Sequence, residues 1–277
     1  MEIKRFIPKS IKKAIKPFFL RVLPLPRPFF IITRGPRPFL VITRGRSGSN
    51  FLVSMLESHP NLYLHYEIFL EEKLRTVSIQ QMINSIGAIE YIKQCYRQRG
   101  YEEAIGCKIL YYQLEPEYAE RMKIPSISLV QGYLRRSCQI KVIHLKRRNK
   151  LKILTSVKLA RLTRQWSLRA DENPLSNKLQ ISLTPEECEN EFLQIEGWEM
   201  KYDQLFQYHP LINVYYEDLI ADIPLMTKQI LDFLKVPYKP LTTNLKKQSN
   251  RPLSEIITNY SELQAYFCNT RWAEFFK

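Results

Sequence analysis

The stretch Gly45-Arg46-Ser47-Gly48-Ser49-Asn50 places small, hydroxyl-bearing and basic residues in an order that suits anion binding. An apolar run at residues 39–42 precedes it, and a helical pattern begins near Phe51. A loop that enters a helix offers free backbone N–H groups to an anion, and the helix dipole adds to the attraction. Gly48 permits a close backbone approach, and Arg46 adds a forked charge. The stretch therefore predicts a phosphate- or sulfate-binding loop, with an ordinary strand–helix turn as the alternative.

A second group of basic and hydroxyl-bearing residues lies in HLKRRNKLKILTSVKLA, residues 144–160. Arg147 and Arg148 follow an apolar strand pattern, and Ser156 lies eight residues after Arg148, inside the expected helix. An Arg at a helix start and a Ser two turns later could hold one phosphate from two sides. Taken alone, the group also fits a solvated basic patch on a helix.

Three further sets of polar residues are candidates for chemistry. His65 and Glu67 end the apolar segment LYLHYE, and because they are two residues apart in an extended strand we expect them to point to one side. Lys108 lies inside the apolar run 104–112, where a lysine more often extends its ammonium to solvent than acts in catalysis. The tail carries a basic group that fits either a cover for a bound phosphate or a solvated run of charge: Lys246, Lys247 and Arg251.

Alternating strands and helices must position these residues. Short apolar runs predict strands near residues 39–42, 61–69, 104–112, 139–146 and 211–216, with helical patterns between them, for example at 72–99, 116–136 and 185–207. This alternation predicts an α/β fold, with about five parallel strands flanked by helices in a single domain. Ligands of such folds bind beyond the carboxyl ends of the strands, which is where the candidate residues fall.

Several classes of site are excluded or disfavoured by the sequence. The loop lacks the Gly-Lys-Ser/Thr ending of a nucleotide triphosphatase, and Ser49 stands where a nucleophile elbow needs glycine. The five cysteines are scattered without a C-x-x-C pair, so we expect no zinc site, no disulfide framework and a reducing compartment. No apolar run approaches the ~20 residues needed to span a bilayer, and no signal-peptide pattern is present.

Basic charge is concentrated at the start of the chain. Residues 1–46 hold 12 Lys and Arg against one Glu, a net charge of +11, whereas the other 231 residues hold 30 basic and 26 acidic residues, a net charge of +4. We therefore divide the chain into a basic, Pro-rich arm at 1–37 and a domain at 38–277. The arm repeats RPF-x-x-ITRG, at 27–35 and again at 37–45, and interleaves apolar residues with lysine. It fits peripheral contact with an anionic membrane or a solvated tail, and no specific nucleic acid is expected.

The ordered set of motifs resembles a known family. RSGSNFLVSMLESHPNL, HYEIF, GCKILYYQ, VIHLKRRNKLKILTSVKLA and VYYEDL are similar to motifs of the bacterial carbohydrate sulfotransferases of the lipopolysaccharide and nodulation-factor type, over about residues 38–277. The resemblance implies a P-loop-like sheet and the donor 3′-phosphoadenosine 5′-phosphosulfate (PAPS), without a metal. It implies a saccharide or glycolipid acceptor. We expect a cytoplasmic protein, which would be peripheral on the inner face of the membrane if the arm binds lipid.

The resemblance also assigns roles to residues of this sequence. It implies that the 5′-phosphosulfate is held by Arg46, Ser47, Gly48, Ser49, Asn50 and Phe51. Arg148 and Ser156 would hold the 3′-phosphate, and Lys247 with its basic neighbours would cover it. Glu67 is the general-base candidate, His65 is the reserve, and Arg46 is the charge best placed to stabilise the leaving group.

A second hypothesis belongs to another class of protein. In it the α/β body is inert, and the basic arm makes the chain a membrane or nucleic-acid adaptor. Binding of the product nucleotide PAP would discriminate the two hypotheses. The sequence leaves the identity of the acceptor and the oligomeric state open.

Overall fold

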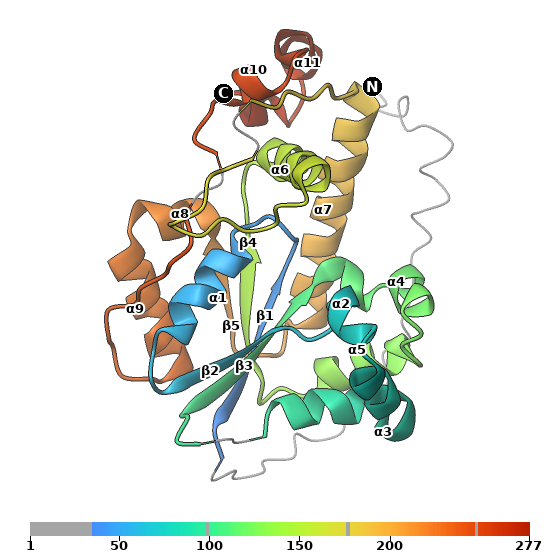
Figure 1. Cartoon of the computed structure of the whole chain (residues 1–277), viewed down its shortest axis with the longest axis vertical. Helices are drawn as coiled ribbons and strands as arrows, with labels where there is room; N and C mark the ends of the chain where they lie inside the picture. Colours follow the sequence, from blue (N-terminus) through green and yellow to red (C-terminus); the bar gives the residue numbers. More distant parts are fainter. Residues whose placement is uncertain (1–34, 98–99, 176–177, 247–248) are drawn as a thin grey trace, which may run out of the picture. The chain divides into compact units, whose positions relative to one another are not determined.

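A five-stranded parallel sheet forms the centre of the protein (Figure 1). The computed structural model describes residues 35–97, 100–175, 178–246 and 249–277. Its strand order is β2-β3-β1-β4-β5, so the strand that precedes the glycine-containing loop lies in the middle of the sheet. The strands are β1 (Arg37–Thr43), β2 (Leu62–Glu67), β3 (Ala104–Leu110), β4 (Lys141–Lys146) and β5 (Leu211–Tyr215). The expected α/β fold is confirmed.

Helices cover both faces of this sheet and its carboxyl end (Figure 1). The face that carries Phe39 and Val41 packs against α1 (Ser49–Glu57) and α9 (Ile223–Leu234). The opposite face, which carries Leu40 and Ile42, packs against α3, α5 and α7. The remaining helices named below are α2 (Glu71–Leu74), α3 (Val77–Cys95), α4 (Pro116–Arg121), α5 (Ile127–Arg136), α6 (Lys150–Thr163), α7 (Pro185–Leu205), α8 (Tyr216–Ala221), α10 (Leu253–Ile256) and α11 (Tyr260–Phe267), with the 3₁₀ turns η2 (Tyr111–Leu114) and η3 (Ala273–Phe276).

A third core lies beyond the carboxyl ends of the strands. It joins Leu151 of α6 and Phe192 of α7 to Phe267 and Trp272 near the end of the chain. The aromatic rings of Phe192 and Phe267 are 5.8 Å apart at their centroids. This core anchors the C-terminal segment to α6 and α7, and thereby fixes one wall of the region where the candidate residues lie.

Several helix boundaries follow local signals in the sequence. Thr184 caps α7 by accepting a hydrogen bond from the Glu187 N–H, while the Glu187 side chain accepts one from the Thr184 N–H, and Pro185 occupies the first turn. Asp222 caps α9 through the Leu225 N–H at 3.0 Å. Asp218, in contrast, lies in the first turn of α8 and is not its N-cap residue.

Two expected helices are divided in the structure. The region 72–99 contains the short α2 and then α3, in which Gly87 has φ 81° and ψ 157° and interrupts the helical backbone. The region 116–136 contains α4 and α5, separated by Lys123 and Ser126 in the left-handed conformation. These breaks depend on backbone conformations that a hydrophobic pattern does not encode.

Most of the N-terminal arm, including the first copy of its repeat at 27–34, lies outside the described residues, as does Lys247. The arm's boundary and membrane contact stay predictions. Within the ranges described, no helix combines the length and the apolar character needed to cross a bilayer.

Candidate functional site

The loop between β1 and α1 is shaped for close contact with a ligand. Gly48 precedes α1 with φ 86° and ψ 14°, and a Cβ at this position would lie 2.2 Å from the Tyr216 ring, so only glycine fits. The first helical hydrogen bond of α1 runs from the Leu52 N–H to the Gly48 carbonyl, at 3.1 Å. The preceding N–H groups therefore belong to the unpaired first turn and are available to an anion.

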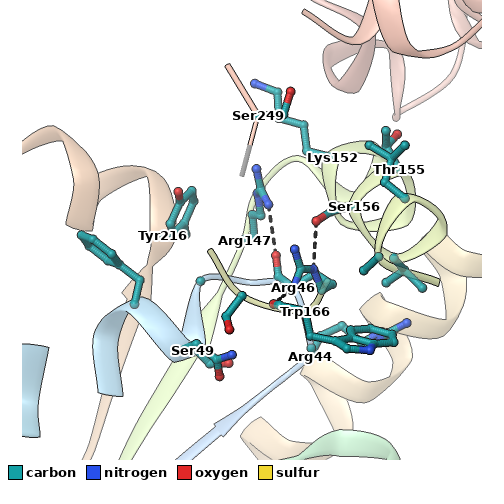
Figure 2. Close-up of a pocket in the computed structure, with 18 of the residues that line it drawn as sticks. Arg44, Arg46, Ser49, Arg147, Lys152, Thr155, Ser156, Trp166, Tyr216 and Ser249 are labelled. Atoms are coloured by element: carbon teal, nitrogen blue, oxygen red, sulfur yellow. Dashed lines mark hydrogen bonds between the residues drawn. The ribbon is translucent and has the colours of Figure 1, made fainter. Parts of the chain in front are cut away.

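Arg46 connects this loop to the opposite wall of the site. Its Nε donates to Ser156 Oγ of α6 at 2.9 Å, and its Nη1 donates to the Trp166 carbonyl (Figure 2). Burial, and then the charge of Arg147, lower the pKa of Arg46 to about 10. The guanidinium therefore stays charged at neutral pH. Ser156 accepts from Arg46 and keeps its own hydroxyl proton to donate to a ligand.

Of the two adjacent arginines after β4, Arg147 enters the site. Its Nη1 donates to the Arg46 carbonyl at 3.0 Å, and its guanidinium lies 4.8 Å from the centroid of the Tyr216 ring (Figure 2). Burial lowers the pKa of Arg147. Two buried guanidinium groups thus lie close together, an arrangement that a bound anion would stabilise.

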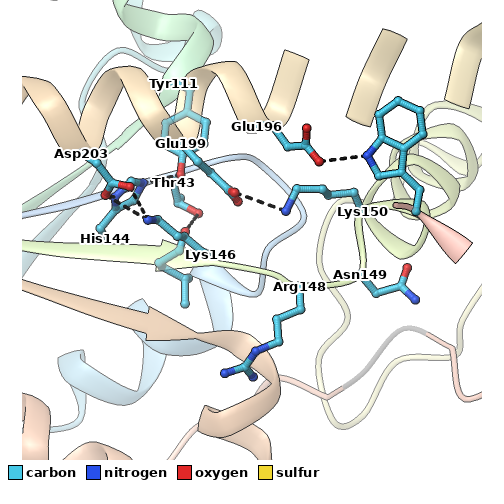
Figure 3. Close-up of polar contacts among 12 residues, drawn as sticks. Thr43, Tyr111, His144, Lys146, Arg148, Asn149, Lys150, Glu196, Glu199 and Asp203 are labelled. Atoms are coloured by element: carbon cyan, nitrogen blue, oxygen red, sulfur yellow. Dashed lines mark hydrogen bonds and ion pairs between the residues drawn. The ribbon is translucent and has the colours of Figure 1, made fainter. Parts of the chain in front are cut away.

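Arg148 is directed elsewhere. It pairs with Asp218 of α8 at 2.6 Å and lies 4.2 Å from the Tyr215 ring, with half of its side chain exposed. Figure 3 shows it pointing away from the residues that surround Lys146 and Lys150. The expected combination of Arg148 with Ser156 is therefore not found. Strand alternation explains the difference, since Leu145 faces the α1 side of the sheet and Arg147, two residues later, continues on that side.

Three buried polar atoms at this site have no hydrogen-bond partner within the described ranges. They are Ser47 Oγ, Arg147 Nε and Thr155 Oγ1. Leaving a buried polar group unsatisfied costs about 1–3 kcal/mol. One guanidinium N–H and two hydroxyls are donors of the kind that suits phosphate or sulfate oxygens, and Arg147 and Thr155 also line the cavity described below.

Glu67 lies across the site from these arginines and pairs with a buried lysine. Its Oε1 is 2.9 Å from Lys108 Nζ, and its Oε2 accepts from Gln113 at 3.0 Å. Lys108 is 1% exposed and also donates to Asn50 Oδ1 in the first turn of α1. Burial lowers the pKa of Lys108, and the neighbouring Glu67 opposes that shift. One ammonium therefore connects the base candidate to the loop.

His65 does not share this position with Glu67. In the pairing of β2 with β3, His65 lies opposite Cys107 and Glu67 lies opposite Lys108, so Tyr66 is an extra residue in a β-bulge. Cys107 and Lys108 are successive residues and point to opposite faces of the sheet. The expectation that His65 and Glu67 point to one side is wrong, and His65 does not line the cavity described below.

The C-terminal basic residues approach the site through backbone contacts. Lys246 lies on the cavity wall, and its N–H and ammonium donate to the carbonyls of Leu168 and Ala170, at 3.0 and 2.9 Å. Arg251 also lines the cavity and donates to the carbonyls of Leu179 and Glu255. The segments around 168 and 246 thus pair with each other beside α6.

One cavity of about 1640 Å³ brings most of these groups together. Single small-molecule pockets usually measure about 300–1,000 Å³, so this cavity has room for two substrates. Its wall includes the predicted Arg46, Gly48, Ser49, Asn50, Phe51, Glu67 and Ser156, but not Ser47, Arg148 or His65. The described residues contain no group of three or more His, Cys, Asp or Glu side chains that could hold a metal.

The cavity wall also includes residues to which the sequence assigned no role. Arg44 pairs with Glu191 of α7 at 2.9 Å and lies 5.7 Å from the Trp198 ring. Thr155 and Tyr216 contribute a hydroxyl and an aromatic surface. Arg44 directly follows β1, and Thr155 precedes Ser156, so proximity to recognised motifs was the available signal.

A polar network supports β4 on the face of the sheet that α7 covers, opposite the face covered by α1. His144 Nδ1 lies 2.8 Å from Asp203 Oδ1, His144 Nε2 lies 2.5 Å from the Tyr111 hydroxyl, and Lys146 Nζ lies 2.7 Å from Asp203 Oδ2 (Figure 3). Burial is the main cause that lowers the pKa of His144. This network joins β4 to α7 behind the cavity and agrees with a structural role for His144.

The chain is similar in sequence to known proteins. A model described as "Sulfotransferase family" matches residues 38–240. Nodulation protein H of Rhizobium meliloti is 28% identical over 259 residues, covering 91% of this chain and 96% of that protein. Nodulation protein H of Rhizobium tropici is 26% identical over 262 residues, covering 92% and 95%. A sulfotransferase structure from Alicyclobacillus acidocaldarius aligns with a TM-score of 0.44 and 15% identity, covering 84% of this chain and 92% of that one.

Proposed function

The chain belongs to the sulfotransferase family, and we propose that it transfers a sulfuryl group from PAPS to a hydroxyl of a saccharide or glycolipid, giving PAP and a sulfate ester. The observation that carries this proposal is one cavity whose wall contains Arg46 and residues 48–51 of the loop together with the pair formed by Glu67 and Lys108. A donor site and an acceptor base must share one space for direct transfer.

Two anion subsites on this chain support PAPS as the donor. The N–H groups at the start of α1 and the Ser47 hydroxyl suit the 5′-phosphosulfate. Arg147, Thr155 and Ser156 suit the 3′-phosphate, and we assign Arg147 to that role in place of Arg148. The donor supplies the sulfuryl group, and the residues supply charge and fixed hydrogen-bond donors.

Glu67 is suited to accept the proton of the acceptor hydroxyl. Lys108 and Gln113 fix its carboxylate, and it lines the same cavity as the loop. Lys108 brings positive charge to the place where the loop and the base meet, which helps the site to stabilise negative charge on the reacting oxygens. Arg46 is the other cation suited to stabilise the leaving group.

The remainder of the cavity suits a saccharide. Its wall includes the aromatic residues Tyr66, Tyr112 and Trp198, together with Glu71 and Gln194. Aromatic faces with a few carboxylate and amide groups can bind sugar rings and their hydroxyls. The similarity to nodulation protein H, and the sequence resemblance to nodulation-factor-type enzymes, support a carbohydrate acceptor.

A reducing compartment such as the cytoplasm agrees with this proposal. All five cysteines are free thiols in the structure. Proteins of oxidising compartments more often pair them in disulfides.

Transfer of labelled sulfate tests the proposal directly. Purified full-length protein would be incubated with labelled PAPS and a panel of saccharide and glycolipid acceptors. We expect label in at least one acceptor, and PAP formation that depends on that acceptor. If PAP binds but no saccharide is labelled, the acceptor class is wrong and the donor assignment survives.

A further inference from the structure

Large apolar side chains are exposed where the cavity opens to solvent. Trp166 and Ile220 line the cavity and are 51% and 45% exposed. Leu162 and Leu175 are each 63% exposed, and both lie near Trp166 along the chain. The Leu175 N–H donates to Gln165 Oε1 at 3.1 Å, which holds Leu175 beside the residue that precedes Trp166. Exposed apolar residues that gather beside a functional opening indicate a contact surface.

Basic side chains border Leu162, Trp166 and Leu175. Arg161, Arg164, Arg169 and Lys246 are all exposed in the same two paired segments, which the bridge between Arg169 and Leu245 joins. Exposed acids are fewer in the 161–175 segment, and one of them, Glu172, accepts a hydrogen bond from the Arg169 N–H. Leucine and tryptophan bordered by arginine and lysine are typical of surfaces that enter the boundary of an anionic bilayer.

We propose that the rim formed by Leu162, Trp166 and Leu175, with its basic border, docks on the surface of an anionic lipid bilayer. The cavity mouth then faces the membrane, and an acceptor carried by a lipid can enter without leaving the bilayer. The basic residues of the arm, 10 against one acid over positions 1–37, add attraction to an anionic bilayer. Nucleic acid is a weaker match, because its phosphates would leave the aliphatic side chains of the rim without a partner.

Fluorescence of Trp166 in the full-length protein tests this contact. The protein would be mixed with vesicles of phosphatidylcholine, or of phosphatidylcholine and phosphatidylglycerol, with and without brominated acyl chains. We expect bromolipid quenching only with the anionic vesicles, and we expect Trp166→Phe to remove it, because Trp272 is 9% exposed and Trp198 is half-buried. The double variant Leu162→Ser/Leu175→Ser should bind anionic vesicles about tenfold more weakly.

Met200→Ser provides the matched control. Met200 is 69% exposed on α7 and does not line the cavity, so its replacement should leave vesicle binding unchanged. Vesicle binding without quenching of Trp166 would show that the arm alone contacts lipid, and would overturn the proposal. Equal binding by wild type and the Leu162/Leu175 variant would also overturn it. These outcomes are independent of PAP binding, so they separate this proposal from the proposed activity.

Discussion

Lys108 Nζ lies 2.9 Å from Glu67 Oε1 and also donates a hydrogen bond to Asn50 Oδ1. One buried ammonium therefore contacts the base candidate at the end of β2 and the first turn of α1. In the proposed reaction these two elements hold the acceptor and the donor. Their shared contact gives the chain a fixed geometry between the two substrates.

Replacing the base candidate should separate chemistry from donor binding. Glu67→Gln keeps the size and hydrogen bonding of the side chain but removes its capacity to accept a proton. We expect turnover to fall by about 10²-fold or more, with PAP affinity nearly unchanged. Glu72→Gln is the control, because Glu72 is an exposed carboxylate on the same cavity wall. Full turnover in the Glu67 variant would remove Glu67 from its proposed role.

The adjacent arginines provide a matched pair of variants. Arg147→Ala should weaken PAP binding by about tenfold or more, because a buried guanidinium that faces the cavity is lost. Arg148→Ala should change affinity much less, because it removes an exposed pair with Asp218. Calorimetric titration of both variants decides between them. If the Arg148 variant loses more PAP affinity than the Arg147 variant, the 3′-phosphate role returns to Arg148, as the spacing from Ser156 predicts.

The pair formed by Lys108 and Glu67 should also affect stability. Lys108→Met leaves the Glu67 carboxylate, 16% exposed, without its cation, and we expect a loss of about 3 kcal/mol in unfolding free energy. Lys201→Met, which breaks the more exposed pair with Glu115, should cost about 1 kcal/mol or less. Urea unfolding measures both.

A double-mutant cycle then isolates the interaction. If the pair is coupled as described, Glu67→Gln combined with Lys108→Met should cost less than the sum of the two single variants. Strictly additive losses would show that Lys108 and Glu67 act independently, and would contradict the coupling.

The buried network behind β4 predicts a dependence of stability on pH. Burial lowers the pKa of His144, and its hydrogen bond with Asp203 only partly opposes this. Below the ordinary histidine value of 6.5, the unfolded chain binds a proton that the folded chain does not bind, so stability must fall as pH falls through this window. Unfolding free energies should therefore decrease as the pH is lowered below about 6.5.

His144→Asn isolates this contribution. The variant should show a flatter pH dependence over the same window, while the other buried histidine, His209, contributes equally to both proteins because burial also lowers its pKa. Identical slopes in wild type and variant would assign the pH dependence to other groups.

The sequence predicts the frame of the site because the frame depends on local patterns. Apolar runs placed the strands, and the glycine and serines between β1 and α1 marked the loop. Spacing from Ser156 favours Arg148, whereas alternation from Leu145 favours Arg147, and the choice between them stays a prediction. The bulge at Tyr66 has no signal of its own in the sequence, so the opposite directions of His65 and Glu67 required the structure.

Long-range partners were the other part that the sequence did not reveal. Lys108 resembled an isolated lysine in a strand until Glu67 and Asn50 were found beside it. Arg46 was expected at the loop, but its contact with Ser156, 110 residues later, depends on how α6 packs over the sheet. Such contacts are set by tertiary packing and not by neighbouring residues.

Calorimetric titration of PAP into the full-length protein tests the central claim most directly. The cavity, with its α1 loop and its Arg147 and Thr155 donors, predicts saturable binding of one PAP molecule per chain. AMP, which lacks the 3′-phosphate, should bind about tenfold more weakly or worse. Failure to bind PAP, in protein that still binds anionic vesicles or nucleic acid in a salt-sensitive way, would contradict the sulfotransferase account and favour an adaptor with an inert body.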